Sequence, residues 1–139
     1  MNRRKEETRP TALDPRSDAL EDEVLDIDPW PHAWRVESQD PPPGQLMLDI
    51  FKVFLLHQVR LGRARKTLRL HRDHLFILGG QLIRLLHENP SLRQRGIVRV
   101  LAESIDDEGG PIIYPPLTES EQRSFESTCK LLHRFMRLG

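Results

Sequence analysis

Residues 62–88 read GRARKTLRLHRDHLFILGGQLIRLLHE, and this stretch decides the fold. Its apolar residues recur at spacings of three and four, which is the period of one buried helical face. Thr67 is suited to cap the helix start, because its hydroxyl can accept a hydrogen bond from an N–H group of the first turn. The pattern predicts one long helix over about 67–88. Its core-facing stripe comprises Leu68, His71, Leu75, Leu78, Leu82, Leu85 and Leu86.

The first part of this helix is basic. Arg65, Arg69 and Arg72 are spaced by four and then three residues, so they share one edge of the helix. A helix N-terminus attracts phosphate through its free N–H groups, and guanidinium groups add bidentate contacts. We expect the arginines of the next helix to continue the same face. The predicted nucleic-acid-binding residues are Arg63, Arg65, Lys66, Arg69, Arg72, Arg93, Arg95 and Arg99.

The regions around this helix predict three more. An apolar stripe that includes Phe51 and Phe54 lies before it, and Gly62 fits the position just past a helix end, where a positive φ is needed. Asn89-Pro90 is typical of a helix start, and Thr118-Glu119-Ser120-Glu121 is a capping box. The sequence therefore predicts an all-α bundle of about four helices over 44–139. The predicted helices span about 44–61, 67–88, 90–104 and 119–137.

Gly79 and Gly80 interrupt the long helix near its middle. Each glycine costs about 1 kcal/mol relative to alanine inside a helix. No GxGxxG or Walker pattern surrounds the pair, which argues against a phosphate loop. We expect close packing of another helix against this point.

Residues 1–43 are predicted to form a flexible, acidic, proline-rich tail, because they show no sustained apolar period. Pro41, Pro42 and Pro43 are expected to form a stiff polyproline spacer, with the domain boundary there. Trp30 and Trp34 lie in this tail. We favour docking of both indoles on the protein's own surface; the alternative is a linear partner-binding element that recruits another protein.

Length and composition limit the class of protein. The chain has 139 residues, which is enough for one domain. No apolar run approaches the roughly 18 residues of a membrane span, and the charged N-terminus lacks the apolar core of a secretory signal. A single cysteine excludes an intramolecular disulfide. These features predict a cytoplasmic protein with no membrane partner.

The zero net charge conceals a strong asymmetry. Residues 1–45 carry 6 Lys/Arg and 11 Asp/Glu, whereas residues 52–99 carry 11 Lys/Arg and only two acids, Asp73 and Glu88. Such clustering of positive charge is typical of proteins that bind a polyanion or an acidic partner. The alternative is that these residues form a solvated helical surface.

No group of residues predicts catalysis. His71 and His74 share a helix but have no third ligand within reach, so no metal site is expected; His71 should lie at the core edge and His74 among the cations. Asp106, Asp107 and Glu108 lack calcium-loop spacing, and Cys129 lies on an apolar helix face. We therefore expect no enzyme activity and no cofactor.

The central stretch resembles the N-terminal SAM-like, core-binding domains of tyrosine recombinases (phage integrases). In these domains an apolar helix, a glycine and a short polar loop precede a helix of the pattern TLxxYxxDLxxFxxxL. Here LMLDIFKVFLLHQVRLG is followed by TLRLHRDHLFILGGQL, with His71 at the usual aromatic position and Leu75 at the leucine. The resemblance covers about residues 45–104, and the catalytic domain of that family does not follow it.

This resemblance implies a four-helix domain that places basic helices in the major groove of DNA, with Arg65, Lys66, Arg69 and Arg72 facing the DNA. The sequence thus predicts a non-catalytic protein that binds double-stranded DNA, similar to a free-standing core-binding domain. The alternative is a protein-interaction module or accessory factor that binds its partner through the acidic tail with Trp30 and Trp34.

Overall fold

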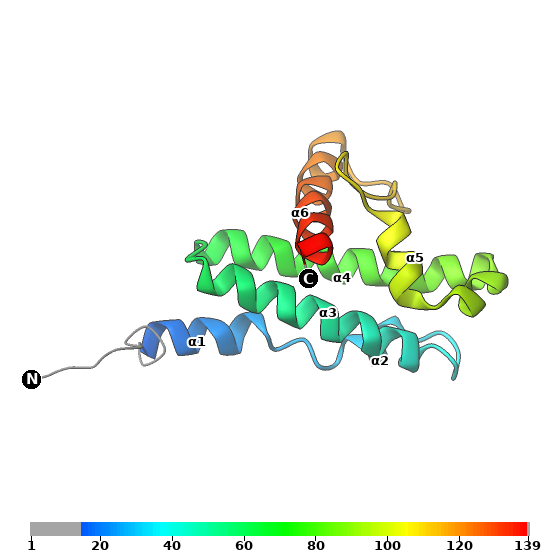
Figure 1. Cartoon of the computed structure of the whole chain (residues 1–139), viewed down its shortest axis with the longest axis horizontal. Helices are drawn as coiled ribbons and strands as arrows, with labels where there is room; N and C mark the ends of the chain where they lie inside the picture. The colour runs from blue at the N-terminus through cyan, green and yellow to red at the C-terminus, as the bar shows by residue number, and fades with distance from the viewer. Residues whose placement is uncertain (1–14, 139) are drawn as a thin grey trace, which may run out of the picture.

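Two long antiparallel helices form the centre of the molecule. In the computed structural model, which describes residues 15–138, α3 spans Pro41–Arg60 and α4 spans Arg65–Glu88. Figure 1 shows them side by side, joined by a short turn. Gly62 lies in this turn at φ 81°, as the sequence predicts. The predicted cap is wrong, because α4 begins two residues before Thr67 and its N-cap is Ala64.

The predicted apolar stripes meet in the core between these helices. Phe51 and Phe54 of α3 are fully buried, as are Leu68, Leu75 and Leu78 of α4. Only the edges of the two stripes are half-buried. The periodicity of the sequence thus identifies the faces that pack together.

The start of α3 differs from the prediction. Pro41, Pro42 and Pro43 form its first turn and not an extended spacer. A helix start leaves its first N–H groups without partners, and proline has no N–H and a φ that suits the first turn. Three prolines therefore begin a helix here without a side-chain cap. The first intrahelical bond runs from Gly44 N to Asp40 O at 3.1 Å.

The segment before α3 is part of the fold, so the expected boundary at residue 43 is wrong. It forms α1 (Pro15–Val24) and α2 (Trp30–Trp34), which lie along the α3–α4 pair in Figure 1. Val24 and Ile27 are fully buried, and Trp34 belongs to the same core. Two short helices give too few turns for a sustained apolar period; the sequence allows a short acidic helix over 19–27, but it does not predict that this segment packs on the domain. Residues 1–14 of the predicted tail lie outside the described residues.

The remaining elements pack on the other side of the pair (Figure 1). They are η2 (Pro90–Arg95), a 3-10 helix, then α5 (Ile97–Ser104) and α6 (Glu119–Leu138). The third helix predicted as continuous is divided at Gly96, whose φ of 85° interrupts it. The capping box is confirmed: Glu121 N donates to Thr118 Oγ1 at 3.1 Å, and Thr118 N donates to Glu121 Oε1 at 2.9 Å.

The all-α class is confirmed, but residues 15–138 contain seven helices, six α-helices and one 3-10 helix, and not four. No helix within those residues combines the length and apolar character that a membrane crossing needs.

Candidate functional site

The structure brings three of the predicted cations together around one residue. Arg65 Nη2 lies 3.5 Å from Glu23 Oε1, Arg69 Nε donates to Glu23 Oε2, and Arg72 Nη1 donates to the backbone oxygen of Glu23 at 3.0 Å. The hydrogen bond from Arg69 lowers the pKa of the Glu23 carboxyl, and the nearby arginine charges lower it further. The basic edge of α4 therefore directs three guanidinium groups toward the oxygens of one residue of α1, two of them toward its carboxylate.

The turn between α3 and α4 adds further cations at this end of the molecule. Arg60, Arg63 and Lys66 are exposed there. Arg63 Nε donates to the buried Gln58 Oε1 at 3.1 Å, which fixes its stem against α3. We call the exposed cations Arg60, Arg63, Arg65, Lys66 and Arg69 the basic end. Arg72 adjoins it on the α1 side.

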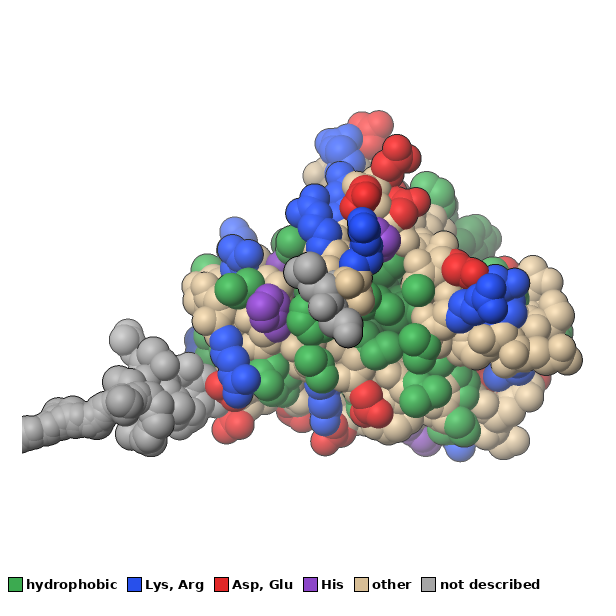
Figure 2. Space-filling view, viewed as in Figure 1, with side chains coloured by type: hydrophobic (Ala, Val, Ile, Leu, Met, Phe, Trp, Pro, Cys, Tyr) green, Lys and Arg blue, Asp and Glu red, His purple; other side chains and the backbone are tan. Residues whose placement is uncertain are grey.

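A second basic surface runs along α6, outside the nucleic-acid-binding residues that the sequence predicts. Arg123, Lys130, Arg134 and Arg137 fall on the face of α6 opposite the buried Phe125 and Leu132. Figure 2 shows Lys and Arg side chains along this helix. The spacings of seven, four and three residues are the signal that could have identified this stripe.

The α6 stripe ends beside the basic end. The Phe135 ring lies 5.6 Å from that of Phe54 and 5.3 Å from that of His57, measured between centroids. His57 is one turn from the end of α3 at Arg60. The C-terminal turns of α6 therefore pack near the α3–α4 turn.

The structure does not bring the other three predicted arginines to this surface. They follow the C-terminal end of α4, about 30 Å from Arg69 at 1.5 Å per helical residue. Arg93 Nη2 donates to Asp40 Oδ1 at 2.7 Å, and both Arg95 and Arg99 pair with Glu103. The expected continuous face is wrong, because an unbroken 24-residue α4 carries the chain to the opposite end of the molecule.

Asp40 organises that opposite end. Its carboxylate is buried and accepts hydrogen bonds from the N–H groups of Val36 and Glu37, both at 2.8 Å, and from His87 Nε2 at 2.9 Å. Burial alone would raise the pKa of Asp40, but these donors and Arg93 hold it well below its usual range. The cluster therefore joins the segment before α3 to the end of α4 and has a structural role.

His71 and His74 form a buried polar pair across Thr128 of α6. Their Nδ1 atoms lie 2.8 Å and 2.7 Å from Thr128 Oγ1. One hydroxyl satisfies both rings if it donates to one Nδ1 and accepts from the N–H of the other. Burial, with repulsion from His74 and Arg63, lowers the pKa of His71 to about 4. Burial also lowers the pKa of His74, so both rings are neutral near pH 7.

His74 thus lies in the core and not among the cations as expected. Within residues 15–138, no three His, Cys, Asp or Glu side chains come close enough to hold a metal ion. Cys129 is buried beside Gly110, and burial followed by the charge of Glu126 raises the pKa of its thiol to about 12. These groups pack and stabilise the core.

The two tryptophans dock on the protein's own α4. Trp34 is 6% exposed, and its Nε1–H donates to Phe76 O at 3.0 Å. A Cβ atom on Gly79 would meet the Trp34 ring at 2.2 Å, so the glycine leaves the space that the indole fills. The favoured docking is therefore confirmed, and the partner that packs closely on Gly79 is an indole of α2. Because Trp34 is buried, a partner cannot contact it as the alternative prediction requires. Trp30 is half-buried, so part of its ring remains accessible.

The comparisons with known proteins identify no relatives: the chain matches no protein-family model, no curated protein and no solved structure.

Proposed function

We propose that this protein contains a non-catalytic, SAM-like DNA-binding domain, similar to the core-binding domain of a tyrosine recombinase. It binds duplex DNA through the basic end and Arg72. The observation that carries the proposal is the convergence of Arg65, Arg69 and Arg72 on the oxygens of Glu23. Carboxylate and phosphate oxygens accept the same guanidinium hydrogen bonds, so the surface suits a phosphate group.

The excess of positive charge also supports DNA binding at this surface. Three arginines contact Glu23, which supplies one carboxylate, and Lys66, Arg63 and Arg60 add further exposed cations. Side chains within residues 15–138 form no cap on the first turn of α4. Its free N–H groups therefore add a partial positive charge to the surface.

The resemblance to the core-binding domains also supports an orientation of α4 in which its apolar face is buried and its basic edge faces outward. Leu68, Leu75 and Leu82, which match apolar positions of the family's pattern, are all buried. The basic residues that the family would turn toward DNA remain outside this core. The three arginines at the far end of α4 are excluded from the proposed interface, because acids pair with them about 30 Å away.

A fluorescence-anisotropy titration of a random-sequence duplex tests the proposal at about 50 and 200 mM salt. If three to five phosphates are neutralised, affinity should fall about 50- to 500-fold between these concentrations. The matching single strand shows whether the duplex is preferred. Absence of duplex binding at the lower salt would overturn the proposal.

A further inference from the structure

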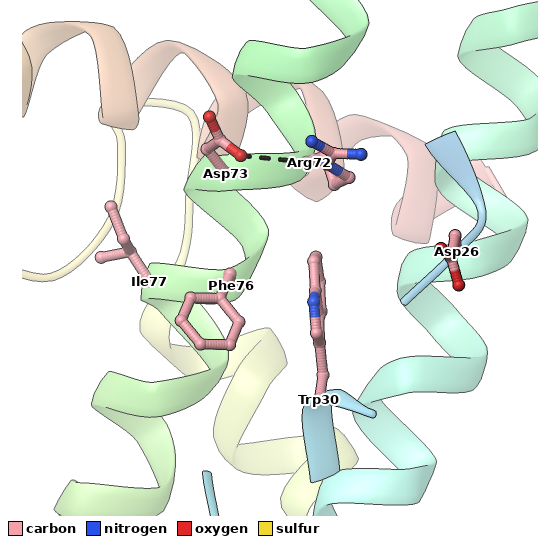
Figure 3. A pocket seen from close by; sticks show the side chains of 6 residues that line it. All are labelled: Asp26, Trp30, Arg72, Asp73, Phe76 and Ile77. Atoms are coloured by element: carbon pink, nitrogen blue, oxygen red, sulfur yellow. Dashed lines mark ion pairs between the residues drawn. The ribbon is translucent and has the colours of Figure 1, made fainter. Parts of the chain in front are cut away.

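A separate pocket lies between the middle of α4 and the segment that joins α1 to α2 (Figure 3). It has a volume of about 590 Å³ and is open to solvent. Its lining residues are Asp26, Trp30, Arg72, Asp73, Phe76 and Ile77.

One wall of this pocket is aromatic. The Trp30 and Phe76 rings meet edge to face, with centroids 5.3 Å apart and planes inclined at 64°. Phe76 is 39% exposed although it carries a large apolar ring. The faces of such rings carry partial negative charge and attract cations.

The charged residues at the rim of the pocket also favour a cationic ligand. Asp26 and Asp73 contribute two carboxylates, and both side chains are exposed. The single cation, Arg72, already donates to Glu23 O at 3.0 Å and lies 3.9 Å from Asp73. The lining therefore has one more negative than positive charge. Its carboxylates would repel a phosphate, so the basic edge of α4 ends at Arg72.

Trp30 is held in position before any ligand arrives. Its backbone N–H donates to the oxygen of the buried Ile27 at 3.0 Å, and Pro31, the next residue, is buried. The Trp30 ring also packs on Trp34, with centroids 5.7 Å apart. Side chains that are fixed in this way lose little entropy when they bind a ligand.

We propose that this pocket binds an arginine or lysine side chain of a partner protein, with the cation against the wall formed by Trp30 and Phe76 and near the carboxylates of Asp26 and Asp73. This partner site adjoins the proposed DNA surface at Arg72, and the proposal does not depend on DNA binding. It also gives Trp30 a recognition role that buried Trp34 cannot have.

The two indole N–H signals in a proton–nitrogen NMR spectrum test the assignment. N-acetyl-arginine amide should move the Trp30 signal saturably, with a Kd of about 1–10 mM as expected for so small a ligand. The Trp34 signal should not move, because that N–H is buried and bonded to Phe76 O. N-acetyl-citrulline amide, which has the same shape without the charge, should leave both signals in place.

Variants and a nucleotide complete the test. Asp26→Asn with Asp73→Asn should weaken arginine amide binding at least fivefold. Asp22→Asn with Asp49→Asn removes two exposed carboxylates elsewhere and should change it less than twofold. An equal response to citrulline amide, or no effect of the Asp26 and Asp73 changes, would overturn the proposal. So would a Trp30 signal that moves with deoxythymidine monophosphate and not with arginine amide, since that would indicate a nucleobase site.

Discussion

At the scale of single residues, Trp34 and Gly79 explain why α4 tolerates a glycine pair. The indole occupies the space where a Cβ atom of residue 79 would lie, and it donates to the α4 backbone at Phe76 O. The cost of glycine in a helix is thus offset by the burial of a tryptophan. The sequence shows the defect in α4, but it could not show which side chain fills it, because Trp34 lies 45 positions away in a region without periodicity.

Gly79→Ala is therefore expected to destabilise the protein by about 3 kcal/mol, since its Cβ atom would overlap the Trp34 ring. Gly80→Ala is the matched control. Its Cβ atom would lie 3.4 Å from Trp34 Cδ1, and alanine favours a helix by about 1 kcal/mol, so stability should be unchanged or slightly higher. Urea denaturation measures both free energies of unfolding. Equal effects of the two substitutions would contradict this account of the pair.

The buried histidines predict a loss of stability in mild acid. The pKa of His71 is about 4 in the folded protein and 6.5 when unperturbed, so the unfolded chain binds the proton more readily between these values. The stabilisation is fully present above about pH 6.5 and is lost as the pH falls toward 4, by about 2 kcal/mol at pH 5. Urea midpoints at pH 7.5 and pH 5 measure this change. His71→Gln cannot titrate and should reduce the difference; an unchanged difference would show that another group causes it.

At the scale of elements, local signals in the sequence located the long helices after residue 41, but they did not show that the segment before it is part of the fold. Gly62 marked the turn between the long helices, and Thr118 with Glu121 marked the start of α6. These signals act through contacts within a few residues, so a sequence reveals them. The docking of α1 and α2 depends on long-range contacts of Val24, Ile27 and Trp34, which no local pattern encodes.

The contact between α1 and α4 predicts that Glu23 restrains DNA binding. Glu23→Gln removes the carboxylate that pairs with Arg65 and Arg69, so affinity for duplex DNA should rise about two- to fivefold at 50 mM salt, where screening is weakest. Glu103→Gln frees Arg95 and Arg99 in the same way, at the far end of α4, and should have no effect. If both substitutions raised the affinity for DNA equally, the cause would be the change in net charge, and the specific role of Glu23 would be contradicted.

Removal of residues 1–40 would not be a clean test of this restraint. It deletes three core side chains, those of Val24, Ile27 and Trp34, together with the buried Asp40. Loss of a single large core side chain commonly costs about 3–5 kcal/mol. The truncated protein should therefore be largely unfolded by circular dichroism and thermal melting; a cooperative transition at an unchanged temperature would contradict the structural role of α1 and α2.

At the scale of the whole molecule, the arrangement of charge separates two sets of arginines that the sequence grouped together. Composition and helical spacing correctly placed Arg65, Arg69 and Arg72 on one edge of α4. They could not show that α4 continues unbroken to Glu88, which puts Arg95 and Arg99 at the opposite end. The distance between the two sets allows each to be changed without affecting the other.

The most direct test of the central claim uses two matched variants in the DNA titration. Glu23→Gln/Arg65→Ala/Arg69→Ala and Glu103→Gln/Arg95→Ala/Arg99→Ala each remove one carboxylate and the two arginines that pair with it. The first variant should bind duplex DNA at least tenfold more weakly at 50 mM salt, and its salt dependence should fall by about two counterions. The second should bind like the wild type. Equal losses, or a loss only in the second variant, would contradict a DNA interface at the basic end.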